Sequence, residues 1–193
     1  GLASFDADPN NRKYSSQDGV LFNKGKTTLV LYPAAKTGAY SIPDTVISID
    51  DYAFQGCTGL TSVTIPSGVV SIGYYVFDGC TGLTSVTISE GVTYIDSHSF
   101  NGCTGLTSVT IPSSVVYVSY HAFQGCTGLT SVTISEGVVH INNYAFQGCT
   151  GLTSVTLPAS TISVYYNSFY GCTGLTFFDV SPDNAKYSSQ DGV

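Results

Sequence analysis

The sequence predicts a mainly β fold, a solenoid of stacked 23-residue rungs, and three observations lead to this prediction. Six cysteines stand 23 residues apart, at Cys57, Cys80, Cys103, Cys126, Cys149 and Cys172. Each of them begins the same pentapeptide, CTGLT. The residues that follow alternate between apolar and hydroxyl side chains, as in a strand with one buried face. Repetition at such a period is typical of solenoids, in which each repeat packs on its neighbours.

Each rung contains the pattern of two strands. Counting the cysteine as position 0, positions 3, 6 and 8 are apolar, as in Leu60, Val63 and Ile65, so the main strand is expected over positions 4 to 8. After a turn, a second and shorter strand is expected around Val69 and Ile72. A phenylalanine at position 20 and a glycine at position 22 suit a buried anchor and a tight corner. No segment is long enough for a conventional helix.

Composition and charge narrow the classes of function. Hydrophobic residues make up 42% and charged residues 10% of the chain, a balance that predicts an ordered protein. The net charge is −7, and no Lys or Arg occurs from Thr37 to Ala185. Binding to a phosphate backbone requires clustered cations, so nucleic acid and anionic membranes are excluded as partners of the repeats. The apolar runs are too short for membrane insertion.

The repeat pattern LxxVxI, then VxxI, then AFxGC covers Ala34 to Thr176 and resembles the BspA-like leucine-rich repeats of bacterial cell-surface proteins. The resemblance implies a right-handed leucine-rich-repeat solenoid of parallel strands. It also implies an extracellular, cell-surface protein associated with adhesion. The chain departs from the broader leucine-rich repeat pattern because Gly or Ser replaces the asparagine of the loop after the strand, so no asparagine ladder is expected. These replacements are Gly68, Gly91, Ser114, Gly137 and Ser160.

The two ends share a second repeat, which divides the chain into three parts. Residues 5–20, FDADPNNRKYSSQDGV, recur at 178–193 as FDVSPDNAKYSSQDGV. We therefore predict an N-terminal cassette with a β-hairpin cap over 1–33, the repeat array over 34–176, and the start of a second cassette over 177–193. The hairpin is expected around Asn23 to Lys26. The chain begins at Gly1, and we expect it to be a piece of a longer protein that contains a further array. The terminal rungs of the present chain are then expected to be exposed, which allows end-to-end self-association.

The cysteine column is compatible with three states. Stacked strands lie about 4.8 Å apart, within the range of Cα separations that a disulfide tolerates. In-register side chains point in the same direction, however, which favours buried free thiols that behave as small hydrophobes. Disulfides and metal binding are the alternatives, although no CxxC pair is present for zinc.

The sequence predicts no enzyme and no cofactor. Serines and threonines recur at identical positions of every rung without a dedicated base, which is a structural pattern rather than a triad. His98 and His121 share position 18 of adjacent rungs, with Asp96 nearby. We interpret them as solvated surface histidines, a metal site being the alternative, and we predict no metal.

Positions 13 to 18 vary from rung to rung, whereas positions 0 to 7 hardly change. The variable residues are almost wholly Tyr, His, Asn, Asp, Ser and Gly, which combine aromatic area with short hydrogen-bonding groups, as binding loops do. The competing interpretation is that exposed positions drift freely. The candidate partner-binding strip comprises Tyr52, Tyr74, Tyr75, Tyr94, His98, Tyr117, Tyr120, His121, His140, Asn143, Tyr144, Tyr165 and Tyr166.

The opposite candidate surface is the outer face of the main strands, with Thr61, Ser62, Thr64 and their copies. Such uniformity suits a repetitive ligand, or simply strand stability, because β-branched Thr is favoured on a pleated surface. Two functions remain: adhesion to a host or matrix protein or a glycan, and a structural spacer arm of a larger surface protein.

Overall fold

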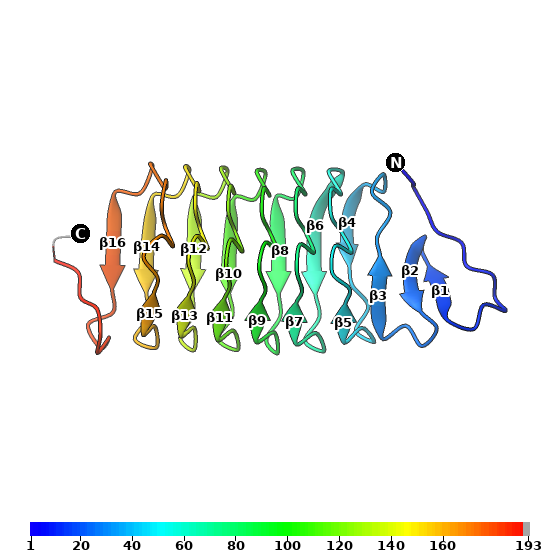
Figure 1. Ribbon diagram of the computed structural model, residues 1–193, viewed down its shortest axis with the longest axis horizontal. Coiled ribbons are helices and arrows are strands. Elements are labelled where there is room, and N and C mark those ends of the chain that lie inside the picture. Colours follow the sequence, from blue (N-terminus) through cyan, green and yellow to red (C-terminus); the bar gives the residue numbers. More distant parts are fainter. Residues whose placement is uncertain (191–193) are drawn as a thin grey trace.

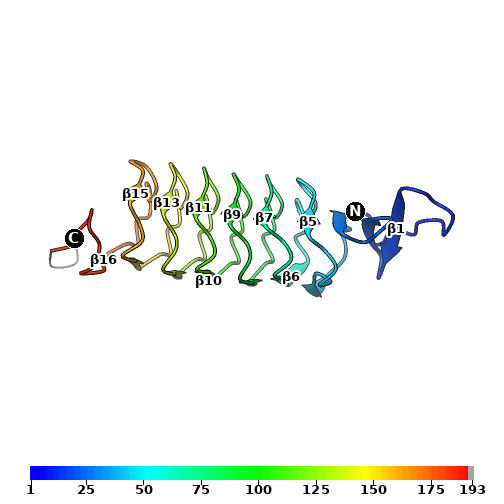
Figure 2. The same ribbon diagram turned by 90° about the horizontal axis from the view of Figure 1, so that it is seen from below.

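The computed structural model describes residues 1–190 and shows an elongated stack of rungs, with the N-terminal cap at one end and the last described residues at the other (Figure 1). No helix occurs among these residues, so none is present that could span a membrane. Each rung except the last contributes one strand to each of two walls, which face each other across the core (Figure 2), whereas the last rung contributes a strand to the first wall only within the described residues. The predicted solenoid of 23-residue rungs is therefore confirmed.

The first wall contains the main strands and is formed by two parallel sheets, β4-β6-β8 and β10-β12-β14-β16. Its strands are β4 (Gly38–Ser41), β6 (Leu60–Ile65), β8 (Ser85–Ile88), β10 (Ser108–Ile111), β12 (Ser131–Ile134), β14 (Ser154–Leu157) and β16 (Phe177–Val180). Equivalent positions pair across the rungs, as Ser62 does with Ser85 and Val63 with Val86. Because the register advances by one whole repeat, identical side chains stack directly on one another.

The second wall contains the short strands, each of two residues. They are β5 (Ser48–Ile49), β7 (Ser71–Ile72), β9 (Tyr94–Ile95), β11 (Tyr117–Val118), β13 (His140–Ile141) and β15 (Ser163–Val164). One parallel sheet contains β7, β9, β11, β13 and β15, and β5 pairs with β3 of the N-terminal cap. The sequence placed this strand correctly, although Val69 lies before it, buried in the core.

Phenylalanines form the spine of the core, as their position in the repeat predicts. The rings of Phe54, Phe77, Phe100, Phe123 and Phe146 are completely buried and stack with centroids 4.8 to 5.2 Å apart. Tyr32 extends the stack at the N-terminal end, where its ring lies 4.8 Å from Phe54. At the other end Phe178 meets Phe169 edge-on, at 84°.

The N-terminal cap contains three antiparallel strands, β1 (Tyr14–Gln17), β2 (Val20–Asn23) and β3 (Thr28–Leu31). The predicted hairpin is the β2-β3 pair, and the Asn23 side chain accepts the N–H groups of Thr27 and Thr28 across its turn. β1 was not predicted. Residues 191–193 of the predicted second cassette lie outside the described residues.

Candidate functional site

The variable positions lie on the short strands of the second wall and at the corner that follows them. At position 18 the backbone is left-handed, with φ of +62° at Tyr52, +55° at Tyr75, +59° at His98, +58° at His121 and +61° at Tyr144. A residue other than glycine adopts this conformation at an energetic cost, so its recurrence shows that the surrounding structure imposes it. The N–H groups at this position donate to the next rung, as Tyr52 N–H does to the Tyr74 carbonyl at 3.0 Å.

The side chains at position 18 form an aromatic ladder along the solenoid. Successive centroids lie 4.5 to 5.1 Å apart and the ring planes are within 10° of parallel. Asn167 continues the column, and its amide donates to the Tyr144 hydroxyl at 3.0 Å. We call this ladder the position-18 ladder; its rings are Tyr52, Tyr75, His98, His121 and Tyr144.

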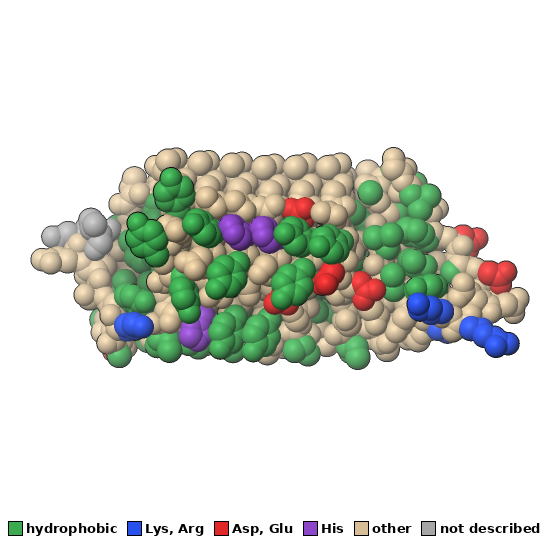
Figure 3. Space-filling view, viewed as in Figure 1, with side chains coloured by type: hydrophobic (Ala, Val, Ile, Leu, Met, Phe, Trp, Pro, Cys, Tyr) green, Lys and Arg blue, Asp and Glu red, His purple; other side chains and the backbone are tan. Residues whose placement is uncertain are grey.

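A second ladder lies on the second wall, at position 14. β9, β11 and β13 pair in register, so the rings of Tyr94, Tyr117 and His140 stack at 5.1 and 4.6 Å. Eight of the thirteen strip residues thus belong to the two ladders. Figure 3 shows these side chains in rows along one face, where the histidines are flanked by large apolar groups.

The remaining strip residues are Tyr74, Tyr120, Asn143, Tyr165 and Tyr166. Three of them occupy position 17 of alternate rungs: Tyr74, Tyr120 and Tyr166, with 51%, 49% and 95% of their surface exposed. Within residues 1–190 none of these three rings stacks on another aromatic ring. A large part of each side chain in this tyrosine row is therefore available to a ligand.

The two adjacent histidines are less solvated than the sequence suggested. Both rings are half-buried in the position-18 ladder, and the Nδ1 atoms of His98 and His121 are buried without a hydrogen-bond partner. Burial, followed by the neighbouring His121, lowers the pKa of His98 below its ordinary value, and Asp78 opposes this shift. The carboxylate that acts on His98 is thus Asp78, whereas Asp96 accepts a hydrogen bond from Ser71.

The histidine pair does not have the geometry of a metal site. The rings of His98 and His121 meet face to face, 10° from parallel, so their in-plane nitrogen lone pairs do not converge on one point. Over residues 1–190, no group of three or more His, Cys, Asp or Glu side chains is arranged to hold a metal ion.

All six cysteines are free and buried in the core. Each thiol from Cys80 onward donates to the carbonyl of the phenylalanine 26 residues before it, as Cys103 Sγ does to Phe77 at 3.1 Å. Burial raises the pKa of Cys103 to about 12. The thiolate, which is the reactive form, is therefore strongly disfavoured, and the column has a structural role.

The hydroxyl face of the first wall is partly satisfied by its own backbone. At position 4, the threonine hydroxyl donates to the threonine carbonyl of the preceding rung, as Thr84 does to Thr61 at 3.0 Å and Thr130 does to Thr107 at 3.0 Å. This bond recurs in five rungs. It links neighbouring rungs and explains the constant threonine without a ligand.

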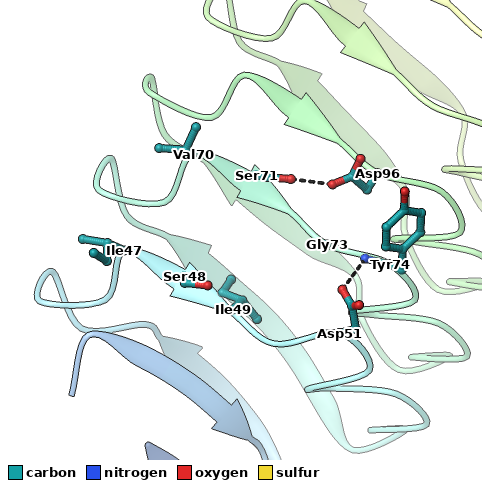
Figure 4. A pocket seen from close by; sticks show the side chains of 9 residues that line it. All are labelled: Ile47, Ser48, Ile49, Asp51, Val70, Ser71, Gly73, Tyr74 and Asp96. Carbon is teal, nitrogen blue, oxygen red and sulfur yellow. Dashed lines mark hydrogen bonds between the residues drawn. The ribbon is translucent and has the colours of Figure 1, made fainter. Parts of the chain in front are cut away.

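A hollow of about 350 Å³ lies beside Tyr74, at one end of the tyrosine row (Figure 4). The residues that line it include Ser48 and Ser71. Both occupy position 14, where later rungs have the aromatic rings of the second ladder. The carboxylate of Asp51 accepts the Tyr74 N–H at 3.0 Å, and that of Asp96 accepts the Ser71 hydroxyl at 2.5 Å.

The sequence did not single out this hollow, although Gly73 is a signal of it. Other rungs carry a side chain at this position, position 16, among them Asp96 and Tyr165. A Cβ on Gly73 would lie 2.6 Å from Asp51 Oδ1, so glycine is required for the observed placement of that carboxylate. The absence of a side chain here keeps the hollow open.

The solved structures that are similar to this one include three bacterial proteins. A leucine-rich repeat protein of Treponema pallidum is 26% identical, with a TM-score of 0.73 over 90% of this chain and 81% of that one. A leucine-rich cell surface protein of Faecalibacterium prausnitzii is 28% identical, with a TM-score of 0.64 over 93% and 42%. The pneumococcal vaccine antigen PcpA shares the fold, with a TM-score of 0.84 over 94% and 45% at 23% identity.

The chain thus spans less than half of the length of the last two proteins. No curated protein matches its sequence. The family model of the BspA-type leucine-rich repeat region matches residues 32–136 and 117–190, in six copies. This match extends over most of the solenoid, and the chain belongs to the BspA-type leucine-rich repeat family.

Proposed function

We propose that this chain is a non-enzymatic binding module of a cell-surface protein, and that it adheres to a host or matrix protein or a glycan. The observation that carries the proposal is the tyrosine row of Tyr74, Tyr120 and Tyr166, exposed and unstacked beside an acidic hollow. Tyrosine supplies a large, rigid contact area with a polar tip at a small cost in conformational entropy.

The surface location is supported by the family and by the Faecalibacterium prausnitzii relative, which is itself a cell surface protein. The non-enzymatic role is supported by the sites. The threonines at position 4 make the same hydrogen bond rung by rung, the strand serines recur at one identical position in each rung, and the thiols are buried. Neither provides the single oriented nucleophile and base that covalent catalysis requires.

A spacer arm is the second candidate, and the two ladders favour it. Eight strip residues stack on one another, which explains their aromatic character by the stability of the solenoid alone. A spacer needs no ligand, so the two functions differ in a measurable property.

The test is an array of matrix proteins and glycans probed with the wild-type chain and with the triple variant Y74S/Y120S/Y166S. A binding module retains at least one ligand, which the triple variant loses while its circular dichroism spectrum stays unchanged. A spacer arm gives no signal with either protein. Tyr170→Ser is the matched control, because Tyr170 is 65% exposed but lies outside the row, at position 21.

A further inference from the structure

We infer that the ligand of the tyrosine row is an extended, uncharged glycan of β-1,4-linked pyranose units, lying along the solenoid axis. This inference rests on the proposed binding function and specifies its ligand. It is carried by three features of the described surface: the spacing of the free tyrosines, the polar groups between and beside them, and the sign of the surrounding charge.

The spacing is that of alternate rungs. Paired strands lie about 4.8 Å apart, so Tyr74 and Tyr120, two rungs apart, are about 9.5 Å apart along the axis, as are Tyr120 and Tyr166. An extended β-1,4-linked glycan repeats after two sugars, because successive rings are turned over, and one such disaccharide is close to this length. Every second sugar can therefore present the same apolar face to a tyrosine ring.

The ladders are unsuited to this task. Their rings stack on each other with nearly parallel planes, so neighbouring rings cover the faces and only the ring edges point outward. A pyranose binds an aromatic ring through its face, as other flat apolar groups do. Among the aromatic columns of this corner, the row at position 17 combines about half or more exposure of each ring with the absence of a stacked aromatic neighbour in the described structure, so it is the row best suited to a sugar.

Short polar side chains separate the tyrosines. Position 17 carries Ser97 between Tyr74 and Tyr120, and Asn143 between Tyr120 and Tyr166; both are half-buried. The intervening sugar presents equatorial hydroxyls, and serine and asparagine are small enough to leave room for them and can donate and accept hydrogen bonds. A tyrosine on every rung would leave no such room.

The hollow beside Tyr74 adds a site for the sugar at one end. Carboxylate oxygens of Asp51 and Asp96 line it, together with the Ser71 hydroxyl, and each oxygen has lone pairs left for sugar hydroxyls (Figure 4). Hydrogen bonds to an ionised acceptor are stronger than those between neutral groups, so these carboxylates favour a polyhydroxylated ligand.

The charge excludes acidic glycans. Asp51 and Asp96 line the hollow and Asp78 lies near His98, while Lys and Arg do not occur from 37 to 185. Figure 3 shows acidic side chains in the middle part of this face and basic ones towards its two ends. A polymer that carries a carboxylate or sulfate on each repeat would be repelled, whereas a neutral one would not.

The experiment is isothermal titration calorimetry of the whole chain with cello- and chito-oligosaccharides of increasing length. The affinity is expected to increase from the disaccharide to the hexasaccharide, because the distance from Tyr74 to Tyr166 is about 19 Å. Maltohexaose, with α-1,4 links and a curved chain, and polygalacturonate, with its negative charge, are expected to bind at least tenfold more weakly. Equal binding of maltohexaose would overturn the inference.

A variant that moves one tyrosine tests the spacing itself. Y120S/S97Y retains three tyrosines but places two of them on adjacent rungs, and it is expected to bind the hexasaccharide about two- to tenfold more weakly, like Y120S alone. Y170S retains full affinity. Undiminished binding by Y120S/S97Y would contradict the two-rung match.

The array of matrix proteins and glycans distinguishes a failure of this inference from a failure of the proposed function. Binding to a matrix protein that Y74S/Y120S/Y166S abolishes, without binding to any β-1,4-linked oligosaccharide, would overturn the glycan inference and leave the binding function standing. No binding to either class would overturn both.

Discussion

The imidazole rings of His98 and His121 stack face to face, with their centroids 4.6 Å apart and their planes 10° from parallel. In the same ladder, Tyr75 stacks on His98 from the N-terminal side and Tyr144 stacks on His121 from the C-terminal side. The two histidines thus occupy positions that tyrosines occupy in the neighbouring rungs. Stacking and partial burial suit a neutral imidazole, and two protonated rings at this distance would repel each other. Burial and the neighbouring His121 lower the pKa of His98, so the contribution of this ring to stability depends on pH.

We expect the free energy of unfolding to decrease as the pH falls from about 7.5 to about 5.5. Burial and His121 lower the pKa of folded His98 below 6.5, so the unfolded chain binds the proton more tightly. This contribution is complete above pH 6.5 and is lost as the pH falls through the folded pKa. Urea denaturation across this range measures it.

The control for the pH dependence is H98Y/H121Y. Tyrosine at these two places stacks as Tyr75 and Tyr144 do, and it does not titrate between pH 5.5 and 7.5, so the slope is expected to flatten. His140→Tyr serves as the comparison, because it makes the same exchange of histidine for tyrosine in the second ladder, outside the histidine pair. An unchanged slope in the double variant would show that the pair is not its source.

The six thiols are expected to be unreactive in the folded chain. Burial raises the pKa of Cys103 to about 12, and its copies are likewise enclosed in the core. A chromogenic disulfide reagent at neutral pH should detect no fast-reacting thiol in the native protein and six after denaturation without reductant. A count below six on denaturation would demonstrate disulfides, and fast native reaction would contradict the burial.

Phe100→Ala is expected to destabilise the solenoid by about 3–5 kcal/mol, since it opens a cavity in the aromatic spine between Phe77 and Phe123. Each rung packs only on its neighbours, so the defect lies within the array and can divide its unfolding into two steps. Guanidinium denaturation followed by circular dichroism measures both effects. Phe177→Ala is the control, because that ring is 49% exposed and its loss should cost about 0.5 kcal/mol or less.

Gly105→Ala is expected to destabilise the chain by about 1–3 kcal/mol. The new Cβ would lie 2.5 Å from the Thr81 carbonyl oxygen and 3.2 Å from that of Leu83, both in the backbone of the preceding rung. Gly25→Ala is the matched control, since its Cβ would meet no atom within 4 Å in the hairpin turn. We expect that variant to be neutral or slightly more stable, because alanine restricts the unfolded chain. Equal melting temperatures for the two variants would refute the steric argument.

Much of the solenoid could be predicted because its period is exact. The alternation at Val63 and Ile65 identified the buried face of the main strand, and the phenylalanine at position 20 identified the spine. β1 was missed, since it does not belong to the 23-residue pattern, whereas β4 follows that pattern and pairs with β6 at a spacing of 23 residues, as Tyr40 does with Val63. The strip residues were identified as a set, but no feature of the sequence separates the rings that stack from those that do not.

The sequence by itself determined the length of the rung, the two strands of each rung and the side chains that fill the core, because one register repeats throughout. Tertiary structure decided the rest. The same tetrapeptide, YSSQ, is a strand at Tyr14–Gln17, where it pairs with β2, and is irregular at 187–190. A strand needs a partner for its N–H and C=O groups, and only the first copy has one in the described structure. Likewise, Tyr74 and Tyr75 are neighbours of identical chemistry, yet a left-handed backbone at Tyr75 places its ring in a ladder and leaves that of Tyr74 free.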